Sequence, residues 1–271
     1  MAGRTLKTEA VVLRSIRYGE ADRILHLYSR ARGRFGAIAK GARRPRSRFG
    51  GRLEPFFRLD LVLHEGRGEL LTVTNVATVD GFPRLRVSGS ALGAAARACD
   101  AVLRLLDTPE PNPPAYNLLC RYLALLDGEG RGPVSAPPSS RRANGAAPSL
   151  AVPGSLADGA GDGAAGLCMA LAFRLKLALA AGFSPELASC ALCGEPDGLV
   201  GFSGAAGGVV CAACERGAFE LSPEAHRFMV EALGRPLASA PAASERALRQ
   251  AERAVSETLE HHAHVRLRAA A

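Results

Sequence analysis

Residues 56–79, FFRLDLVLHEGRGELLTVTNVATV, indicate a β-hairpin and decide the fold of the first part of the chain. Leu59, Leu61 and Leu63 alternate mostly with polar residues, which is the period-2 pattern of a strand with one buried face. The segment EGRG at 65–68 is typical of a tight turn, and the residues after it are again rich in Leu, Val and Thr. Two antiparallel strands are therefore predicted here.

Three more apolar runs precede this hairpin, at residues 8–17, 22–29 and 35–40. Each is rich in Val, Ile, Leu or Tyr, or in small apolar residues, and no helical pattern separates them. Five short strands in this part of the chain predict a small closed antiparallel barrel, of which the OB fold is one natural form. We therefore expect an OB-fold domain over residues 1–80.

The period of the apolar residues changes after Phe82 and becomes helical. The stretches with helical spacing are 92–106, 116–123, 167–181, 223–234 and 245–259. They predict an all-helical domain over residues 81–271. The chain as a whole is thus expected to be an α+β multidomain protein, in which an N-terminal OB-fold β-barrel is followed by a helical domain with an inserted four-cysteine zinc finger.

Residues 128–165 interrupt this helical domain and consist largely of Gly, Pro, Ser and Ala. Such a composition buries too little apolar surface to offset the entropy of ordering the chain. We expect a flexible loop inside the helical domain. A linker between two separate domains is the alternative, and it is less favoured because the helices on both sides need packing partners.

Four cysteines carry the strongest chemical signal, and they lie in a module at 188–216. Two Cys-x2-Cys pairs, each able to form one tight knuckle, are separated by seventeen residues: Cys190, Cys193, Cys211 and Cys214. Four thiolates complete a tetrahedral shell around one structural Zn²⁺ and leave no position open for hydrolytic chemistry. The alternatives are two redox-active pairs or a metal-free site held by packing.

The remaining cysteines and a histidine cluster are expected to have other roles. Cys99, Cys120 and Cys168 lie on predicted helix faces and are interpreted as small core residues. The run EHHAH at 260–264 places its three histidines in different directions around a helix, which disfavours a shared metal site.

The positive charge of the chain is concentrated in residues 30–52. The chain has 34 Lys and Arg against 26 Asp and Glu, a formal net charge of +8, and this segment alone contributes nine positive charges without one acid. The nine residues are Arg30, Arg32, Arg34, Lys40, Arg43, Arg44, Arg46, Arg48 and Arg52. A local field of one sign predicts binding to a polyanion, and a merely solvated loop is the alternative.

Neither a membrane span nor an active site is recognisable. The best apolar run, 167–183, is interrupted by Arg174 and Lys176, and the N-terminus lacks the apolar core of a signal peptide. We therefore expect a cytoplasmic protein without membrane association. GAIAKG at 36–41 lacks the spacing of a phosphate-binding loop, and no nucleophile–base set is apparent, so we expect a binding protein and not an enzyme.

Several segments together resemble the RecO family, bacterial mediators of DNA repair and recombination. They are Tyr18-Gly19-Glu20, AKGARRPRSRFGGRLEPF at 39–56, GRGEL at 66–70, FRLKLALAAGFSPELASCALCG at 173–194, and the second Cys-x2-Cys pair. The resemblance implies an N-terminal OB fold, a helical C-terminal domain and a zinc finger. It also implies binding of single- and double-stranded DNA, annealing of complementary strands, and a place in the RecF pathway at the bacterial nucleoid.

The resemblance further implies protein partners. They are RecR and the acidic C-terminal tail of the single-stranded DNA-binding protein, with RecA acting indirectly, because the family helps to load RecA onto coated single strands. A zinc-ribbon RNA-binding or ribosome-associated factor is the rival interpretation of the same basic barrel and cysteines. A protein-interaction scaffold that receives an acidic tail is a third.

On an OB barrel the 30–52 segment is expected to give a basic strand and an adjoining loop to one surface. Its cations would neutralise phosphates, and Tyr28, Phe35 or Phe49 could stack on bases, although burial in the core is the expected fate of each. Nothing in the segment offers a code for particular bases, so little sequence preference is predicted.

Overall fold

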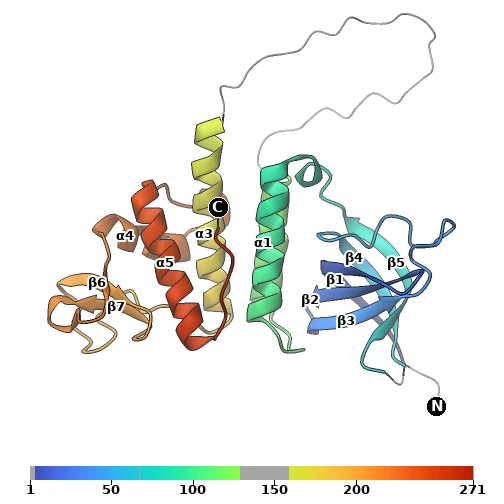
Figure 1. Cartoon of the computed structure of the whole chain (residues 1–271), viewed down its shortest axis with the longest axis horizontal. Coiled ribbons are helices and arrows are strands. Elements are labelled where there is room, and N and C mark those ends of the chain that lie inside the picture. Colours follow the sequence, from blue (N-terminus) through green and yellow to red (C-terminus); the bar gives the residue numbers. More distant parts are fainter. Residues whose placement is uncertain (1–3, 67, 129–158, 271) are drawn as a thin grey trace, which may run out of the picture.

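In the computed structural model of the chain, residues 4–66, 68–128 and 159–270 are described. A β-barrel lies at one side of the molecule, the helices occupy the middle, and a small sheet lies beyond them at the far side (Figure 1). Helix α1 (Gly89–Leu105) stands against the barrel, and the later helices lie behind it. This arrangement confirms the predicted fold class.

The barrel is built from five strands in the closed order β1-β2-β3-β5-β4. The strands are β1 (Thr5–Tyr18), β2 (Asp22–Ser29), β3 (Gly33–Ala39), β4 (Arg58–His64) and β5 (Leu71–Asp80). Four of the strand pairings are antiparallel, but β3 and β5 pair in parallel. The prediction of a wholly antiparallel barrel is therefore wrong for this one pairing. The reason is topological: β4 pairs with β1, and β5 then returns antiparallel to β4 in the direction of β3.

The barrel interior follows the period-2 pattern of the sequence. Leu25 and Leu27 of β2 and the three leucines of β4 are fully or almost fully buried in one core. Residues 40–57, which connect β3 to β4, contribute Phe49 and Leu53 to the same core, with exposed fractions of 1% and 2%. We call this connection the basic loop, and these two side chains anchor it to the barrel.

Among the described residues, the helical part contains α1 and four further helices. They are α2 (Pro113–Leu126), α3 (Gly159–Ala180), α4 (Pro223–Gly234) and α5 (Glu245–His262), with short 3-10 turns at Leu85–Val87, Ala212–Cys214 and Leu237–Ser239. Ser88, Asn112, Ser222 and Ser244 each accept a backbone N–H bond as N-caps, which explains where four of these helices begin. Between α3 and α4 lies a sheet of β6 (Leu199–Ser203), β7 (Gly208–Cys211) and β8 (Phe219–Glu220) in the order β7-β6-β8.

Helix α3 begins earlier than the sequence pattern suggested. It starts at Gly159, so residues 159–165 belong to this helix and not to the loop predicted at 128–165. The part of that predicted loop at 129–158 lies outside the described residues. Among the residues that the structure describes, no helix is both long and apolar enough to cross a membrane.

The outer face of the barrel contributes side chains to the hydrophobic core of the helices, which is separate from the core inside the barrel. Val11 and Leu13 of β1 and Tyr28 of β2 point outward from the barrel and pack in the same cluster as the helices. Arg34 of β3 donates hydrogen bonds to the carbonyls of Leu103, at 3.0 Å, and Asp107, at 2.7 Å. Because these contacts bury apolar surface and fix a guanidinium, the barrel is held firmly against α1.

Gly33 marks the closest approach between the barrel and the helices. It has a left-handed φ of +61°, and a Cβ there would lie 2.0 Å from the carbonyl oxygen of Glu110. Gly19 has a similar φ of +52° but open space around it. We therefore expect Gly19→Ala to lower the free energy of unfolding by about 1–2 kcal/mol through backbone strain alone. Gly33→Ala should lower the free energy of unfolding by about 1–3 kcal/mol more than Gly19→Ala does, because the backbone of Glu110 must also move.

Urea unfolding of the two variants measures this difference directly. Equal losses of unfolding free energy would mean that the contact between the β2–β3 turn and the segment before α2 does not hold the barrel in place.

Candidate metal centre and nucleic-acid interface

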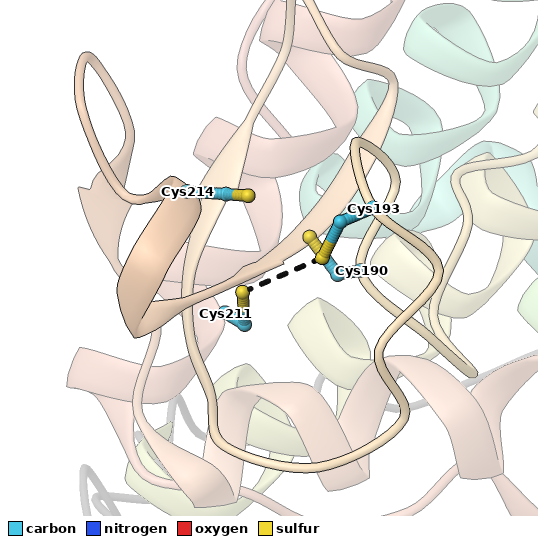
Figure 2. A group of neighbouring side chains, drawn as sticks. All are labelled: Cys190, Cys193, Cys211 and Cys214. Carbon is cyan, nitrogen blue, oxygen red and sulfur yellow. Dashed lines mark hydrogen bonds between the residues drawn. The ribbon is translucent and has the colours of Figure 1, made fainter.

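The four predicted cysteines come together in the small sheet module. Their Sγ atoms all lie within 4.8 Å of one another, and Figure 2 shows them pointing into one shared space. Cys190 and Cys211 are buried, whereas Cys193 is exposed and Cys214 is half-buried. The Sγ atoms of Cys193 and Cys211 are 3.7 Å apart, far beyond the roughly 2.05 Å of a disulfide bond.

Backbone turns present the thiols of each pair in the same direction. In the first pair, the N–H of Gly194 donates to the carbonyl of Cys190 at 2.8 Å, and Gly194 adopts a left-handed φ of +80°. In the second pair, Cys211 ends β7 and the 3-10 turn Ala212–Cys214 brings Cys214 round to face it. Each pair thus forms a knuckle that offers two ligands to one centre.

The electrostatics of the cluster favour a bound cation. The backbone N–H of Cys211 is the largest of several donors that lower the pKa of Cys190 to about 6, which favours its thiolate form. Hydrogen bonds with the thiols of Cys193 and Cys211 are the largest causes that raise the pKa of Cys214 to about 12, so this thiol stays protonated beside them. A divalent cation compensates the negative charge of the sulfurs and lets all four thiols ionise.

The geometry fits a tetrahedral metal ion. Four sulfurs at about 2.3 Å from a central zinc are about 3.8 Å from one another, and the Sγ atoms of Cys193 and Cys211 are 3.7 Å apart. The described residues contain no other group of three or more Cys, His, Asp or Glu side chains that could hold a metal ion. The four cysteines can therefore hold one metal ion with a closed coordination shell.

The other candidates for thiol or metal chemistry are structural. Cys99 and Cys168 are buried in the helical core and Cys120 packs against it, which confirms their predicted place. Burial is the largest cause of the raised pKa of Cys99 and of Cys120. In the histidine run, His262 faces the carbonyl of Gly204 at 2.9 Å, a contact that joins α5 to the β6–β7 turn.

The structure divides the nine predicted DNA-binding cations into two groups, which corrects the expectation of one continuous surface. Arg30 and Arg32 lie in the turn before β3, and the six cations of the basic loop come after it. The seven residues of β3 separate the two groups by roughly 20 Å. Neighbours in sequence are thus at opposite ends of the barrel.

Arg34 differs from the other eight, because its guanidinium is held by the two carbonyls at the end of α1. Arg32 is half-buried. The remaining seven cations are exposed: Arg30, Lys40, Arg43, Arg44, Arg46, Arg48 and Arg52. Within the described parts of the chain, no carboxylate forms an ion pair with any of these seven, so their charge is available to an anionic partner.

The basic loop is fixed against the turn between β1 and β2. The N–H of Gly41 donates to Asp22 Oδ1 at 2.7 Å, and the N–H of Arg43 donates to the carbonyl of Ala21 at 2.8 Å. The guanidinium of Arg43 also reaches the carbonyl of Gly19 at 3.2 Å. The loop therefore presents its cations from a defined position on the barrel.

The aromatic residues suggested by the sequence are not available for stacking. Tyr28 and Phe49 are completely or almost completely buried, and Phe35 packs partly against the barrel core. The guanidinium of Arg48 lies over the Phe49 ring at 4.9 Å. Among the described residues, the exposed aromatic side chain is that of Tyr18, which is 55% accessible at the end of β1. In the sequence, its exposure was indicated only by its place before the turn at Gly19.

Comparison with known proteins agrees with this architecture. The profile described as "Recombination protein O N terminal" matches residues 1–82, and "Recombination protein O C terminal" matches residues 160–270. The DNA repair protein RecO of Rubrobacter xylanophilus is 37% identical over 257 residues, covering 92% of this chain and 88% of the relative. That of Anaeromyxobacter dehalogenans is 33% identical over 272 residues, covering 97% and 94%. The two matched profiles and these relatives span most of the chain, which therefore belongs to the RecO family of DNA repair proteins.

Proposed function

We propose that this protein is a recombination mediator that binds single- and double-stranded DNA through the basic loop and anneals complementary strands. The observation that carries the proposal is the set of six exposed cations at 40–52, none in an ion pair with a described carboxylate, on a loop fixed to the barrel. Contacts of this kind neutralise phosphates irrespective of base sequence. A protein that anneals any complementary pair of strands must bind DNA without sequence preference.

Annealing also follows from the same electrostatics. Two single strands repel each other through their phosphates, and a cationic surface that screens both backbones lowers that barrier. This step needs no bond-making chemistry, so we propose that the protein acts without enzymatic activity and without ATP. We also propose that the four thiolates hold one structural Zn²⁺, the ion that most often occupies a closed four-cysteine shell.

The family supports a wider proposal. With RecR, the protein would help to load RecA onto single strands coated by the single-stranded DNA-binding protein, in the cytoplasm and at the nucleoid of its bacterial cell. The acidic C-terminal tail of the coating protein would dock on the helical domain, a surface separate from the basic loop. RecR would bind directly, whereas RecA would be affected indirectly.

The proposal is tested by annealing of complementary strands coated with the single-stranded DNA-binding protein. We expect annealing without ATP, no change when ATP is added, and slower annealing when the coating protein lacks its acidic tail. Equal rates with the intact and the tailless protein would contradict docking of the tail. Absence of annealing on naked strands, with DNA still bound, would contradict the annealing function itself.

The rival interpretation, an RNA-binding zinc-ribbon factor, is separated by competition. We expect unlabelled single-stranded DNA to displace a bound DNA oligonucleotide at lower concentration than structured RNA of equal length does. The opposite order would favour the rival.

A further inference from the structure

A row of isoleucines crosses the outer face of three neighbouring barrel strands. On β2 and β3, Leu25, Leu27, Ala37 and Ala39 point into the barrel core, so the alternate residues point outward. The register pairs Ile16 of β1 with Ile24 of β2, and Ile24 with Ile38 of β3. The three side chains therefore lie side by side on the outer surface.

Part of this outer face is covered and part of it is open. Val11, Leu13 and Tyr28 lie beneath the helices, in the core that they share with α1. Further along the same strands, Ile16 is 41% exposed, Ile24 and Ile38 are partly exposed, and none of the three belongs to a buried cluster of the described residues. An apolar row of this kind on a solvent-facing sheet marks a site of interaction.

The apolar row continues at both of its edges. Tyr18 is two residues beyond Ile16 on β1 and is 55% exposed. Gly36 lacks a side chain beside Ile38, and Leu70, itself 36% exposed, lies over it. The resulting surface is aromatic at the end where β1 meets the turn to β2. We call these residues, Tyr18, Ile16, Ile24, Ile38 and Leu70, the apolar platform.

Free cations border the platform at one end. The basic loop begins directly after Ala39 of β3. The guanidinium of its Arg43 donates to the carbonyl of Gly19 at 3.2 Å, and Gly19 follows Tyr18 in the chain. At the other end, the next row of the same face contains Arg14, which forms an ion pair with Asp100 at 3.2 Å, and His26. Burial, followed by the charges of Arg14 and Arg34, lowers the pKa of His26, so its ring is uncharged near neutral pH.

Apolar surface with a cationic loop beside it matches the chemistry of a single strand of nucleic acid. Unpaired bases expose flat apolar faces that stack on aromatic and apolar side chains, while the phosphates need cations alongside. A duplex hides those base faces within its own stack. A purely acidic peptide such as polyglutamate would use the cations but has no planar side chains to cover Tyr18 and the isoleucines.

We propose that the apolar platform binds the bases of single-stranded nucleic acid, with Tyr18 stacking on a base while the basic loop holds the phosphates. This inference rests on the proposed DNA binding and adds to it a second kind of contact. Phosphate contacts alone do not distinguish strands by their bases, whereas the platform gives single strands an advantage over duplex DNA.

The chain contains no tryptophan, so a Tyr18→Trp variant reports on this position alone. We expect its fluorescence to be quenched when a single-stranded oligonucleotide binds, because stacking on a base quenches indole emission. An abasic oligonucleotide of equal length and charge should bind more weakly and leave the emission unchanged. The matched control is Val79→Trp, at a 38% exposed position on β5 outside the platform. Its emission should not be quenched by the intact or by the abasic oligonucleotide.

Affinity measurements complete the test. Tyr18→Ala should weaken binding of single strands about tenfold, with the salt dependence unchanged, and should leave duplex binding unaltered. If anisotropy shows the oligonucleotide bound while the emission of Tyr18→Trp does not change, this inference is wrong and the proposed DNA binding stands. If polyglutamate quenches the emission as strongly as DNA does, the platform is a protein-docking surface. If no oligonucleotide binds at all, the proposed function fails as well.

Discussion

Cys190→Ser and Cys211→Ser proteins should each lose their metal and unfold in the module at 188–216. The sheet of β6, β7 and β8 has a very small core of its own, formed by Cys190, Val210 and Cys211 with a few partly buried neighbours. Structural zinc contributes about 10–16 kcal/mol of binding free energy in isolated zinc fingers, far more than such a core supplies. Removing one of the four ligands opens the shell and withdraws most of that stabilisation.

Metal content and proteolysis measure this together. Wild-type protein should contain one zinc ion per chain, and chymotrypsin should not cut after Phe202, whose side chain is completely buried. Each serine variant should lose zinc and be cut there. Cys168→Ser is the matched control: this cysteine is buried in the helical core, so its replacement should leave the zinc content unchanged. Wild-type protein that is well folded and contains no zinc would contradict the proposal that the four cysteines bind zinc.

The barrel and the helices were predictable because their apolar residues repeat with a period that reports local structure. The alternation around Leu59 and Leu61 identified β4, and the helical spacing of 223–234 and 245–259 identified α4 and α5. The cysteine spacing likewise predicted four convergent ligands, since a knuckle is a local structure. In each case the information lies within a short window of sequence.

Contacts between distant segments were not predictable in this way. Arg174 seemed only to interrupt an apolar run, yet it is 5% exposed and forms an ion pair with Glu252 at 3.0 Å. It also donates to the carbonyl of Arg268, which holds the C-terminal segment against α3. The partners of this charge lie well over seventy residues away along the chain, so no local pattern could indicate its burial.

The basic segment shows the same limit at the candidate site. Its charge and a strand at 35–40 were evident in the sequence, but the use of Arg34 as a structural contact depends on how the barrel meets α1. The exposure of Tyr18 likewise depends on β1 extending beyond the part of the barrel that the helices cover.

Replacing Arg43, Arg44 and Arg46 together by alanine should weaken binding to single-stranded DNA about a hundredfold at 0.1 M salt. All three side chains are exposed, and none forms an ion pair with a described carboxylate. Each phosphate contact contributes about −0.7 to the slope of log K against log salt on single strands. Five contacts from the loop would give a slope of about −3.5, and losing three should flatten it by about 2.

Folding should be little affected, because Phe49, Leu53 and backbone bonds anchor the loop, and the substitutions remove a single guanidinium contact, that of Arg43 with the carbonyl of Gly19. The matched control removes the same charge elsewhere: Arg246, Arg249 and Arg253 on α5 are also exposed. Each of them faces a glutamate, so their charge is largely balanced locally. Both triple variants reduce the formal net charge from +8 to +5, a difference of three.

The most direct test is therefore the salt dependence of single-stranded DNA affinity in the wild-type protein and in these two triple variants. A slope that flattens by about 2 in the basic-loop variant, and stays at the wild-type value in the α5 variant, is the predicted result. A basic-loop variant that keeps the wild-type slope would show that DNA is bound elsewhere on the protein.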